Sequence, residues 1–270
     1  IFNKNTELFI NILSEFFPFS TQILDEYSNN EIKLNSDISF SEKNINLLNW
    51  NELSLNQNLP WSIELIQKYE KKWIWGWEGL SENIKLPWSY ELIEKFEDKW
   101  DWSLISKNTN LPWSINLIDK YQNKLNWSEL SKNQNLPWNK ELIEKFIDYW
   151  DWNNISLYIS LPQDIIEHFK EKINWGFNGL SYNKSIRWNV DFIENHKDKL
   201  SWSRLSCNES LPWNEDFFER YINKWDWSGD DFGYSFGLSG NSKLPWSNVF
   251  FEKYLDKWRI IYMSNNTGLP

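Results

Sequence analysis

The chain has 270 residues, of which 18% are aromatic and 21 are tryptophan, and its formal net charge is -10. This aromatic content is too high for a disordered chain. The acidic balance argues against nucleic acid, whose binding depends on Lys and Arg neutralising phosphates. It also disfavours anionic membrane surfaces, and because no run of about 18 apolar residues is present we expect no membrane span.

Cysteine usage bears on the compartment. Cys207 is the only cysteine, so no disulfide can form within the chain. Disulfides are typical of secreted proteins and rare in reducing compartments. With no visible signal or membrane segment, a cytoplasmic location is favoured over a secreted one, and the compartment is not fixed further.

The first 59 residues are interpreted as divergent N-terminal capping repeats. Residues 17–20 (FPFS) and 38–41 (ISFS) look like degenerate starts of a repeat that becomes regular from residue 60 onward. A terminal repeat must cover one side of the core, so divergence is expected there. Residues 60–270 form the predicted Trp-rich array. Because residues 264–270 reproduce the usual lead-in to another repeat, we expect the array to continue beyond them.

Within the array, a landmark proline marks each repeat of about 25 residues. It occurs at Pro60, Pro87, Pro112, Pro137, Pro162, Pro212 and Pro245, and Arg187 takes the remaining position. Most neighbours are 25 residues apart, whereas two spacings are 27 and 33. These longer spacings contain insertions at residues 76–79 and 228–237, and residues 175–179 (WGFNG) repeat the first insertion (WGWEG).

Each repeat is predicted to open with an amphipathic helix of about 12 residues. In the repeat of Pro87, the apolar residues Leu92, Ile93, Phe96 and Trp100 follow helical spacing. Ser89 suits the N-cap position of this helix. Ten or so isolated residues would not hold a helix, so packing between repeats must supply the stability.

The second half of each repeat is ambiguous. Trp100-Asp101-Trp102 fits a two-residue strand, or a short helical turn capped by Asp101 or Ser103. No β-branched run or clean alternation appears, which favours the turn. We therefore predict an all-α fold, an elongated solenoid with one helix and a short turn or 3-10 segment per repeat. The alternative is an α/β solenoid of the leucine-rich type.

Several positions recur so strictly that a structural role is expected. A serine and, two places later, an asparagine recur through the array, as in Ser106 and Asn108 or Ser131 and Asn133. Small polar side chains held this strictly predict hydrogen bonds to loop backbone. Two regular tryptophan rows, represented by Trp113 and Trp127, are expected to lie mainly in the core. An exposed row of rings remains the alternative.

The phrase Leu-Ser-x-Asn-x-x-Leu-Pro-Trp, as at residues 130–138, is followed by Leu-Ile-Glu-Lys-Phe and Trp-Asp-Trp. It resembles the tryptophan-rich short-repeat proteins of AT-rich bacteria and large DNA viruses, over residues 38–270. The resemblance implies a repeat architecture and no particular activity. Gln163 and Arg187 depart from its Pro-Trp pattern.

Catalytic chemistry finds little support. The only histidines, His168 and His196, fall on a Lys position and an aromatic position of the repeat and look like local substitutions. Residues 233–237 (GYSFG) match the G-x-S-x-G nucleophile motif by letter, but they lie in an insertion and not between a strand and a helix. We expect no enzyme, no cofactor and no metal site.

Binding is the function that such an array favours. Insertions in repeat proteins map to loops that often form the binding edge. The candidate binding residues are Trp77, Phe177, Phe232, Tyr234 and Phe236 in the insertions, together with the irregular Gln163 and Arg187. Alternatively, the inserted rings fold back and cover the seam between repeats.

The leading hypothesis is a non-enzymatic scaffold that binds another macromolecule, with protein as the expected partner. The first alternative is a glycan-binding module that uses exposed Trp and Tyr rings. The second is a structural role, either end-to-end self-association or a sensor segment of a larger protein.

Overall fold

The computed structural model of the protein describes residues 11–12, 14–28, 48–229, 236–264 and 266–269. Every regular element in these ranges is helical and none is a β-strand. The all-α prediction is therefore confirmed, and the α/β alternative is not supported. The chain forms two compact units, an N-terminal unit (residues 1–130 and 135–137) and a C-terminal unit (residues 131–134 and 138–270).

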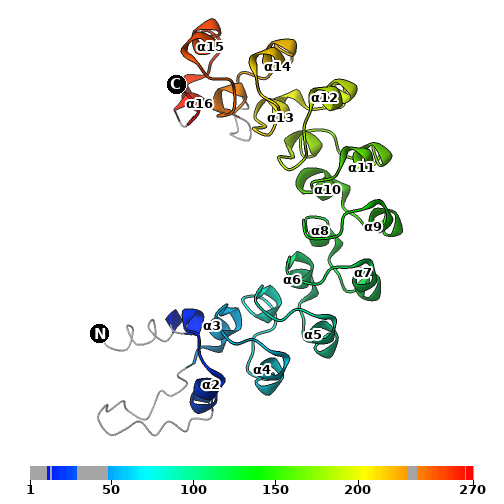
Figure 1. The fold of residues 1–270 in the computed structure, drawn as a ribbon, viewed down its shortest axis with the longest axis vertical. Coiled ribbons are helices and arrows are strands. Elements are labelled where there is room, and N and C mark those ends of the chain that lie inside the picture. Colours follow the sequence, from blue (N-terminus) through cyan, green and yellow to red (C-terminus); the bar gives the residue numbers. More distant parts are fainter. Residues whose placement is uncertain (1–10, 13, 29–47, 230–235, 265, 270) are drawn as a thin grey trace, which may run out of the picture. The chain divides into compact units, whose positions relative to one another are not determined.

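Within the N-terminal unit the helices lie in two rows (Figure 1). The first row holds the helices that open the repeats: α2 (Thr21–Ser28), α4 (Ile63–Lys68), α5 (Tyr90–Lys95) and α7 (Ile115–Tyr121). The second row holds α3 (Trp50–Leu55), the 3-10 helix η1 (Leu80–Glu82), α6 (Trp102–Lys107) and α8 (Trp127–Leu130). Successive members of the second row contact one another.

The C-terminal unit is built in the same way. Its first row holds α9 (Lys140–Lys145), α11 (Gln163–His168), α12 (Val190–His196), α14 (Glu215–Arg220) and α15 (Asn248–Lys253). Its second row holds α10 (Trp152–Tyr158), η2 (Leu180–Tyr182), α13 (Trp202–Ser206), η3 (Leu238–Gly240) and α16 (Ile260–Met263). Helix η2 contacts both α10 and α13, and η3 contacts α16.

The opening helices begin as predicted but are shorter than predicted. Ser89 is the N-cap of α5, and its Oγ accepts the backbone N–H of Leu92 at 3.1 Å. The helix ends after six residues, at Lys95, so the expected length of about 12 residues was wrong. Phe96 leaves the helical region with φ -121° and ψ 28°.

Tryptophan explains why the apolar spacing outlasts the helix. Beyond Phe96 the backbone bonds three residues back, as when the Lys99 N–H donates to the Phe96 carbonyl at 2.9 Å. Trp100 then turns its indole N–H back to the Ile93 carbonyl at 3.1 Å. A helix leaves its last carbonyls without intrahelical partners. The indole therefore supplies a bond that a longer helix would have made.

Tryptophan indoles donate hydrogen bonds to backbone carbonyls at three positions of the repeat. The position of Trp100 donates to the carbonyl seven residues earlier, at Trp73, Trp100, Trp150, Trp225 and Trp258. The position after the landmark proline donates to the carbonyl of the recurrent asparagine, at Trp61, Trp88, Trp113, Trp138, Trp188, Trp213 and Trp246. The remaining position donates to the carbonyl five residues earlier, at Trp75, Trp102, Trp127, Trp152, Trp175 and Trp202. Short helices have many end carbonyls, which accounts for the abundance of tryptophan.

The second element of a regular repeat is helical, as predicted, but it is a separate short α-helix where only a turn or 3-10 segment was expected. Asp101 caps α6, because its carboxylate accepts the backbone N–H groups of Ser103 and Leu104 at 3.0 and 3.1 Å. The buried hydroxyl of Ser106, near the end of this helix, donates to the Trp102 carbonyl at 2.7 Å. It also accepts the N–H of Asn126, in the next repeat, at 2.9 Å.

Asparagine makes the second set of bonds between repeats. The Asn208 amide donates to the carbonyls of Ser181 and Asn183, in the preceding repeat, at 3.2 and 3.0 Å. Its side-chain oxygen accepts the N–H of Ser210 at 2.9 Å, which closes a local turn. Asn108 bonds to the carbonyl of Ser81 and the N–H of Asn110 in the same way. The expected bonding of these residues to loop backbone is thus present.

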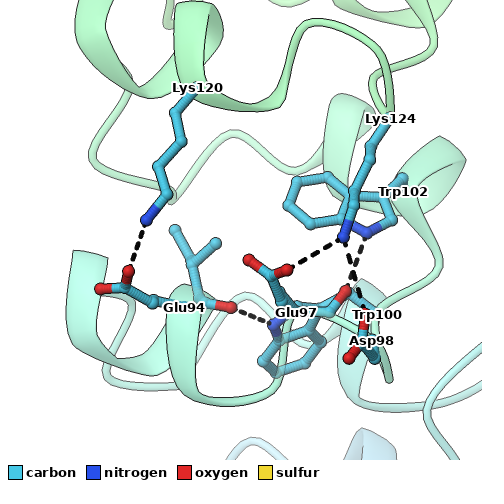
Figure 2. A network of polar contacts seen from close by, with 8 residues as sticks. Glu94, Glu97, Asp98, Trp100, Trp102, Lys120 and Lys124 are labelled. Carbon is cyan, nitrogen blue, oxygen red and sulfur yellow. Dashed lines mark hydrogen bonds and ion pairs between the residues drawn. The ribbon is translucent and has the colours of Figure 1, made fainter.

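Charged side chains join successive opening helices on their outer face. Figure 2 shows Lys120 of α7 reaching Glu94 of α5, with Nζ and the carboxylate 2.6 Å apart. Lys124 lies 3.3 Å from Glu97 and covers the ring of Trp102, with Nζ 5.5 Å from the centroid. Exposed ion pairs contribute only about 0–1 kcal/mol each. These pairs therefore help to set register and contribute little to the core.

Residues 11–28 behave as a further, divergent repeat. Asn56 donates its amide to the carbonyls of Ser14 and Phe17 at 2.8 and 3.0 Å, as the asparagines of the array do. Ser20, at the predicted degenerate start, accepts the N–H of Ile23 at the beginning of α2. The other predicted start, at residues 38–41, lies outside the described residues.

Candidate interaction surface on the insertion loops

The regular tryptophan rows are not an exposed ladder. Trp77 is the one tryptophan among the exposed large apolar residues of the described ranges. The faces of several half-buried rings are covered by a lysine of the following repeat. Such lysines lie over Trp50, Trp102, Trp202 and Trp227, with Nζ 5.1–5.5 Å from the centroid. A row of free rings for sugar stacking is therefore not found in the described part of the chain.

Three insertions replace the short α-helix by a loop and a 3-10 helix. In the first two the loop closes when the N–H of Leu80 donates to the Ile74 carbonyl at 2.8 Å, and that of Leu180 to Asn174 at 2.7 Å. The backbone passes so close that a Cβ at Gly79 would lie 2.2 Å from the Ile74 oxygen. Only glycine fits there, and the same holds at Gly179, so the second glycine of WGWEG and of WGFNG shapes its loop.

Phe177 folds back onto the next repeat. The guanidinium carbon of Arg204 lies 3.2 Å from the Phe177 ring centroid, and its Nε donates to the Phe177 carbonyl at 3.1 Å. Tyr182 lies on the same guanidinium, 5.0 Å from its ring centroid. Arg204 is only 5% exposed, whereas Phe177 keeps 46% of its surface. Arg204 thus connects this loop to helix α13 of the next repeat.

Phe236 makes a comparable contact at the third insertion. Its ring centroid lies 5.5 Å from that of Tyr262 in α16, and the ring is 52% exposed. The predicted candidates Phe232 and Tyr234 lie outside the described residues. For Phe177 and Phe236 the structure therefore favours the alternative in which inserted rings cover a seam.

Trp77 differs from both. Its side chain is 70% exposed, and it has no ring, cation or hydrogen-bond partner within the described ranges. The following residue, Glu78, has φ 54°, an uncommon conformation for a residue other than glycine. The loop thus turns the indole outward and leaves its large apolar surface in contact with water. The free energy that burial of this surface would contribute to folding is lost.

One position of the following repeat distinguishes these loops, and sequence reasoning missed it. The residue two places before the recurrent serine is Leu104, Arg204 or Tyr262 where the preceding repeat carries an insertion. Where neither the preceding repeat nor the repeat itself carries an insertion, the residue at this position is polar, as in Glu52, Glu129 and Asn154. An alignment of the repeats against one another would have revealed this pairing of each loop with a larger residue.

The two departures from the Pro-Trp pattern meet in the C-terminal unit. The side-chain amide of Gln163 donates to the Arg187 carbonyl at 2.9 Å, and its oxygen accepts from Asn189 at 3.2 Å. Gln163 thus makes a bond between repeats in the place of a tryptophan. The Arg187 side chain is exposed. This pairing gives Gln163 a structural role, and its predicted part in binding stays a prediction.

The histidines make the contacts of the residues that they replace, and His168 lies 3.1 Å from Glu144 at the position where Lys120 pairs with Glu94. The buried His196 bonds through Nε2 to Glu167 of the preceding repeat and stacks on Trp175, 4.3 Å between centroids. Tyr221 and Tyr254, at the same position of later repeats, donate in the same way to Glu194 and Glu219 of their preceding repeats. No group of three His, Cys, Asp or Glu side chains is placed to hold a metal in the described part.

None of the helices in the described ranges combines the length and the apolar character that crossing a membrane requires.

Comparison with known proteins gave no significant match to a protein family, a curated protein or a solved structure. The resemblance to tryptophan-rich short-repeat proteins therefore rests on the motif alone. Function has to be argued from the surface that the chain presents.

Proposed function

We propose that this chain is a non-enzymatic scaffold of the tryptophan-rich short-repeat type, an elongated helical solenoid that binds another protein through the loop around Trp77. One observation carries the proposal, namely that Trp77 is 70% exposed, whereas the tryptophans of the three regular positions donate indole hydrogen bonds to the backbone and Trp50 and Trp227 pack against neighbouring rings. The repeat needs those others for its backbone or its packing. It has no such need of Trp77.

The physical cost of the loop supports a role in recognition. Tryptophan is enriched among the few interface residues that dominate binding energy, because it buries a large rigid surface. Left in water, the same ring forgoes the free energy that burial of its apolar surface would contribute. A loop with a glycine-enforced closure and a positive φ at Glu78 holds it in that position. Rigid presentation lowers the entropy lost on binding.

Selection from a display library of short random peptides tests the proposal. The full chain serves as bait, and each selected peptide is then measured against the Trp77→Ala variant. We expect the selected peptides to lose at least about tenfold in affinity, as hot-spot truncations do. The matched control is Phe177→Ala, which removes the equivalent ring of a loop already covered by Arg204, and should leave affinity unchanged. Peptides that bind both variants like wild type contradict the proposal.

The other predicted roles stay predictions. Glycan binding would now have to use isolated rings in place of a ladder, and a glycan array probed with wild type and Trp77→Ala would examine it. End-to-end self-association predicts that sedimentation depends on protein concentration. Neither has a specific observation in its favour.

A further inference from the structure

The loop around Phe177 shows how an arginine binds to one of these insertions. The Arg204 guanidinium lies flat against the aromatic ring, 3.2 Å from its centroid, and donates through Nε to the Phe177 carbonyl. Arginine is suited to such a place because its planar cation stacks on aromatic faces and still donates hydrogen bonds. Here the chain itself fills the site, with a residue from the next repeat.

The loop around Trp77 has the same parts without the arginine. Its backbone closes through the same bond, from the Leu80 N–H to the Ile74 carbonyl. Tryptophan, the ring that attracts cations most strongly, replaces phenylalanine. The residue equivalent to Arg204 is Leu104, which is buried and carries neither charge nor donor on its side chain. An aromatic face is therefore left open in the first loop.

Carboxylates lie near this loop. Glu78 follows Trp77 directly in the sequence. The pKa of Glu52 in α3 is raised by its partial burial and then by the charges of Glu15 and Glu78, which places these carboxylates near one another. Neither Glu15, Glu52 nor Glu78 forms an ion pair within the described ranges. These three carboxylates thus add negative charge near the loop that no ion pair within the described residues neutralises, which favours a cation.

From the occupied second loop and the charge of the first, we propose that the Trp77 loop binds an arginine side chain on an extended segment of its protein partner. This inference rests on the proposed function of the same loop and specifies the partner's chemistry. The guanidinium lies over the indole, donates to the Trp77 carbonyl as Arg204 does to Phe177, and faces Glu78 and Glu52. Lysine fits less well, although lysines lie over tryptophan rings elsewhere in the chain, because an ammonium group cannot lie flat on the indole and donate to the Trp77 carbonyl as the Arg204 guanidinium does at Phe177.

The test uses the peptides selected on the full chain. We expect arginine to be enriched relative to the starting library, and replacement of the key arginine by citrulline, its neutral isostere, to weaken binding about tenfold. The double variant Glu52→Gln with Glu78→Gln should weaken arginine peptides severalfold. The matched control is Glu91→Gln with Glu141→Gln, which removes two charges from exposed first-row helix positions and should leave affinity unchanged.

A variant that fills the site from within gives an independent check. Leu104→Arg reproduces the residue found at Arg204, so its guanidinium should cover Trp77 and compete with the peptide. We expect loss of peptide binding of about tenfold or more with an unchanged circular dichroism spectrum. Leu104→Met, which keeps an apolar side chain of similar volume, should bind like wild type.

The outcomes separate the two proposals. Peptides that depend on Trp77 but tolerate citrulline, or show no arginine enrichment, overturn the arginine inference and leave the binding role of the loop intact. Absence of any Trp77-dependent peptide overturns both. Arginine enrichment, a citrulline defect and blockage by Leu104→Arg together support the inference.

Discussion

The hydroxyl oxygen of Ser106 lies 2.9 Å from the backbone nitrogen of Asn126, which donates to it from the following repeat. The same hydroxyl donates to the Trp102 carbonyl within its own repeat. One buried oxygen therefore joins the end of one short helix to the beginning of the next. Its equivalents recur, as where Ser206 accepts from Asp226 at 2.8 Å.

Replacement of Ser106 by alanine should destabilise the protein by about 1–3 kcal/mol, because it leaves a buried N–H without a partner. The free energy of unfolding measured in urea checks this. Ser103→Ala is the control, since this exposed serine accepts only from the Asn126 side chain at 3.0 Å. Its expected cost is below about 0.5 kcal/mol. Equal losses in the two variants would contradict the role given to Ser106.

Leu125 occupies the position at which Trp100 donates to a helix-end carbonyl in the preceding repeat. It borders a gap, shared with Trp113 and Tyr121, that is too small to hold a water molecule. Leu125→Trp should raise the free energy of unfolding by about 1 kcal/mol, through one added hydrogen bond and filled space.

Overpacking is the result that would contradict the prediction for Leu125→Trp. If the gap cannot widen to hold the larger ring, the variant should lose about 1–3 kcal/mol of stability, and the interpretation of the gap would be wrong. The reverse change, Trp100→Leu, serves as the control. It should cost about 2–5 kcal/mol, because it removes buried surface and an existing bond.

Ionisation of the Tyr221 hydroxyl should lower the stability of the protein at alkaline pH. Burial, followed by the hydrogen bond from its hydroxyl to Glu194 at 2.8 Å, raises the pKa of Tyr221 to about 12. Its ordinary value is 10.0. The folded state thus keeps a proton that the unfolded chain gives up. The associated stability is complete below pH 10 and is lost as pH rises towards about 12. Thermal unfolding between these pH values should show the decline, and Tyr221→Phe should reduce it.

Tyr121 provides the matched comparison at neutral pH. It is buried like Tyr221, but its hydroxyl has no hydrogen-bond partner within the described ranges. Tyr121→Phe should therefore be neutral or slightly stabilising, whereas Tyr221→Phe should cost about 1–3 kcal/mol for a bond to a charged acceptor. The same cost in both would show that the Glu194 bond contributes nothing.

The charge of Glu52 should favour peptide binding but lower the stability of the fold. Its pKa is raised, chiefly by burial and then by Glu15 and Glu78. A raised carboxyl pKa means that the folded state holds the proton more tightly, so stability falls as pH rises through that pKa. Glu52→Gln should therefore raise the melting temperature at pH 7 while it weakens arginine peptides. A lower melting temperature would show that the Glu52 charge is stabilising.

The repeat, the N-caps of its helices and the hydrogen-bonding role of its recurrent serine and asparagine were predicted from the sequence, because these features depend on local chemistry that recurs. Ser89 and Asp101 cap their helices as their positions predicted. The length of α5 could not be read in this way. Helical apolar spacing continued through Trp100 and predicted backbone hydrogen bonds there, but the bond to the Ile93 carbonyl is made by the Trp100 indole.

The candidate site was predicted only in part, for a similar reason. Sequence pointed to Trp77 and Phe177 as equivalent rings, and their loops do close alike. Which ring stays open depends on a residue from the next repeat, Leu104 or Arg204, about 27 positions away. Contacts over that distance depend on how repeats pack, and helical or turn periodicity does not reveal them.

The bonds of Ser106 and Asn208 also bear on how the chain folds. A single 25-residue repeat on its own would leave its serine without an incoming N–H and its asparagine amide without the carbonyls of a predecessor. Folding must therefore begin with at least two neighbours ordering together and proceed by adding repeats to an existing edge. Such growth lets a damaged repeat open locally while the rest of the array stays folded.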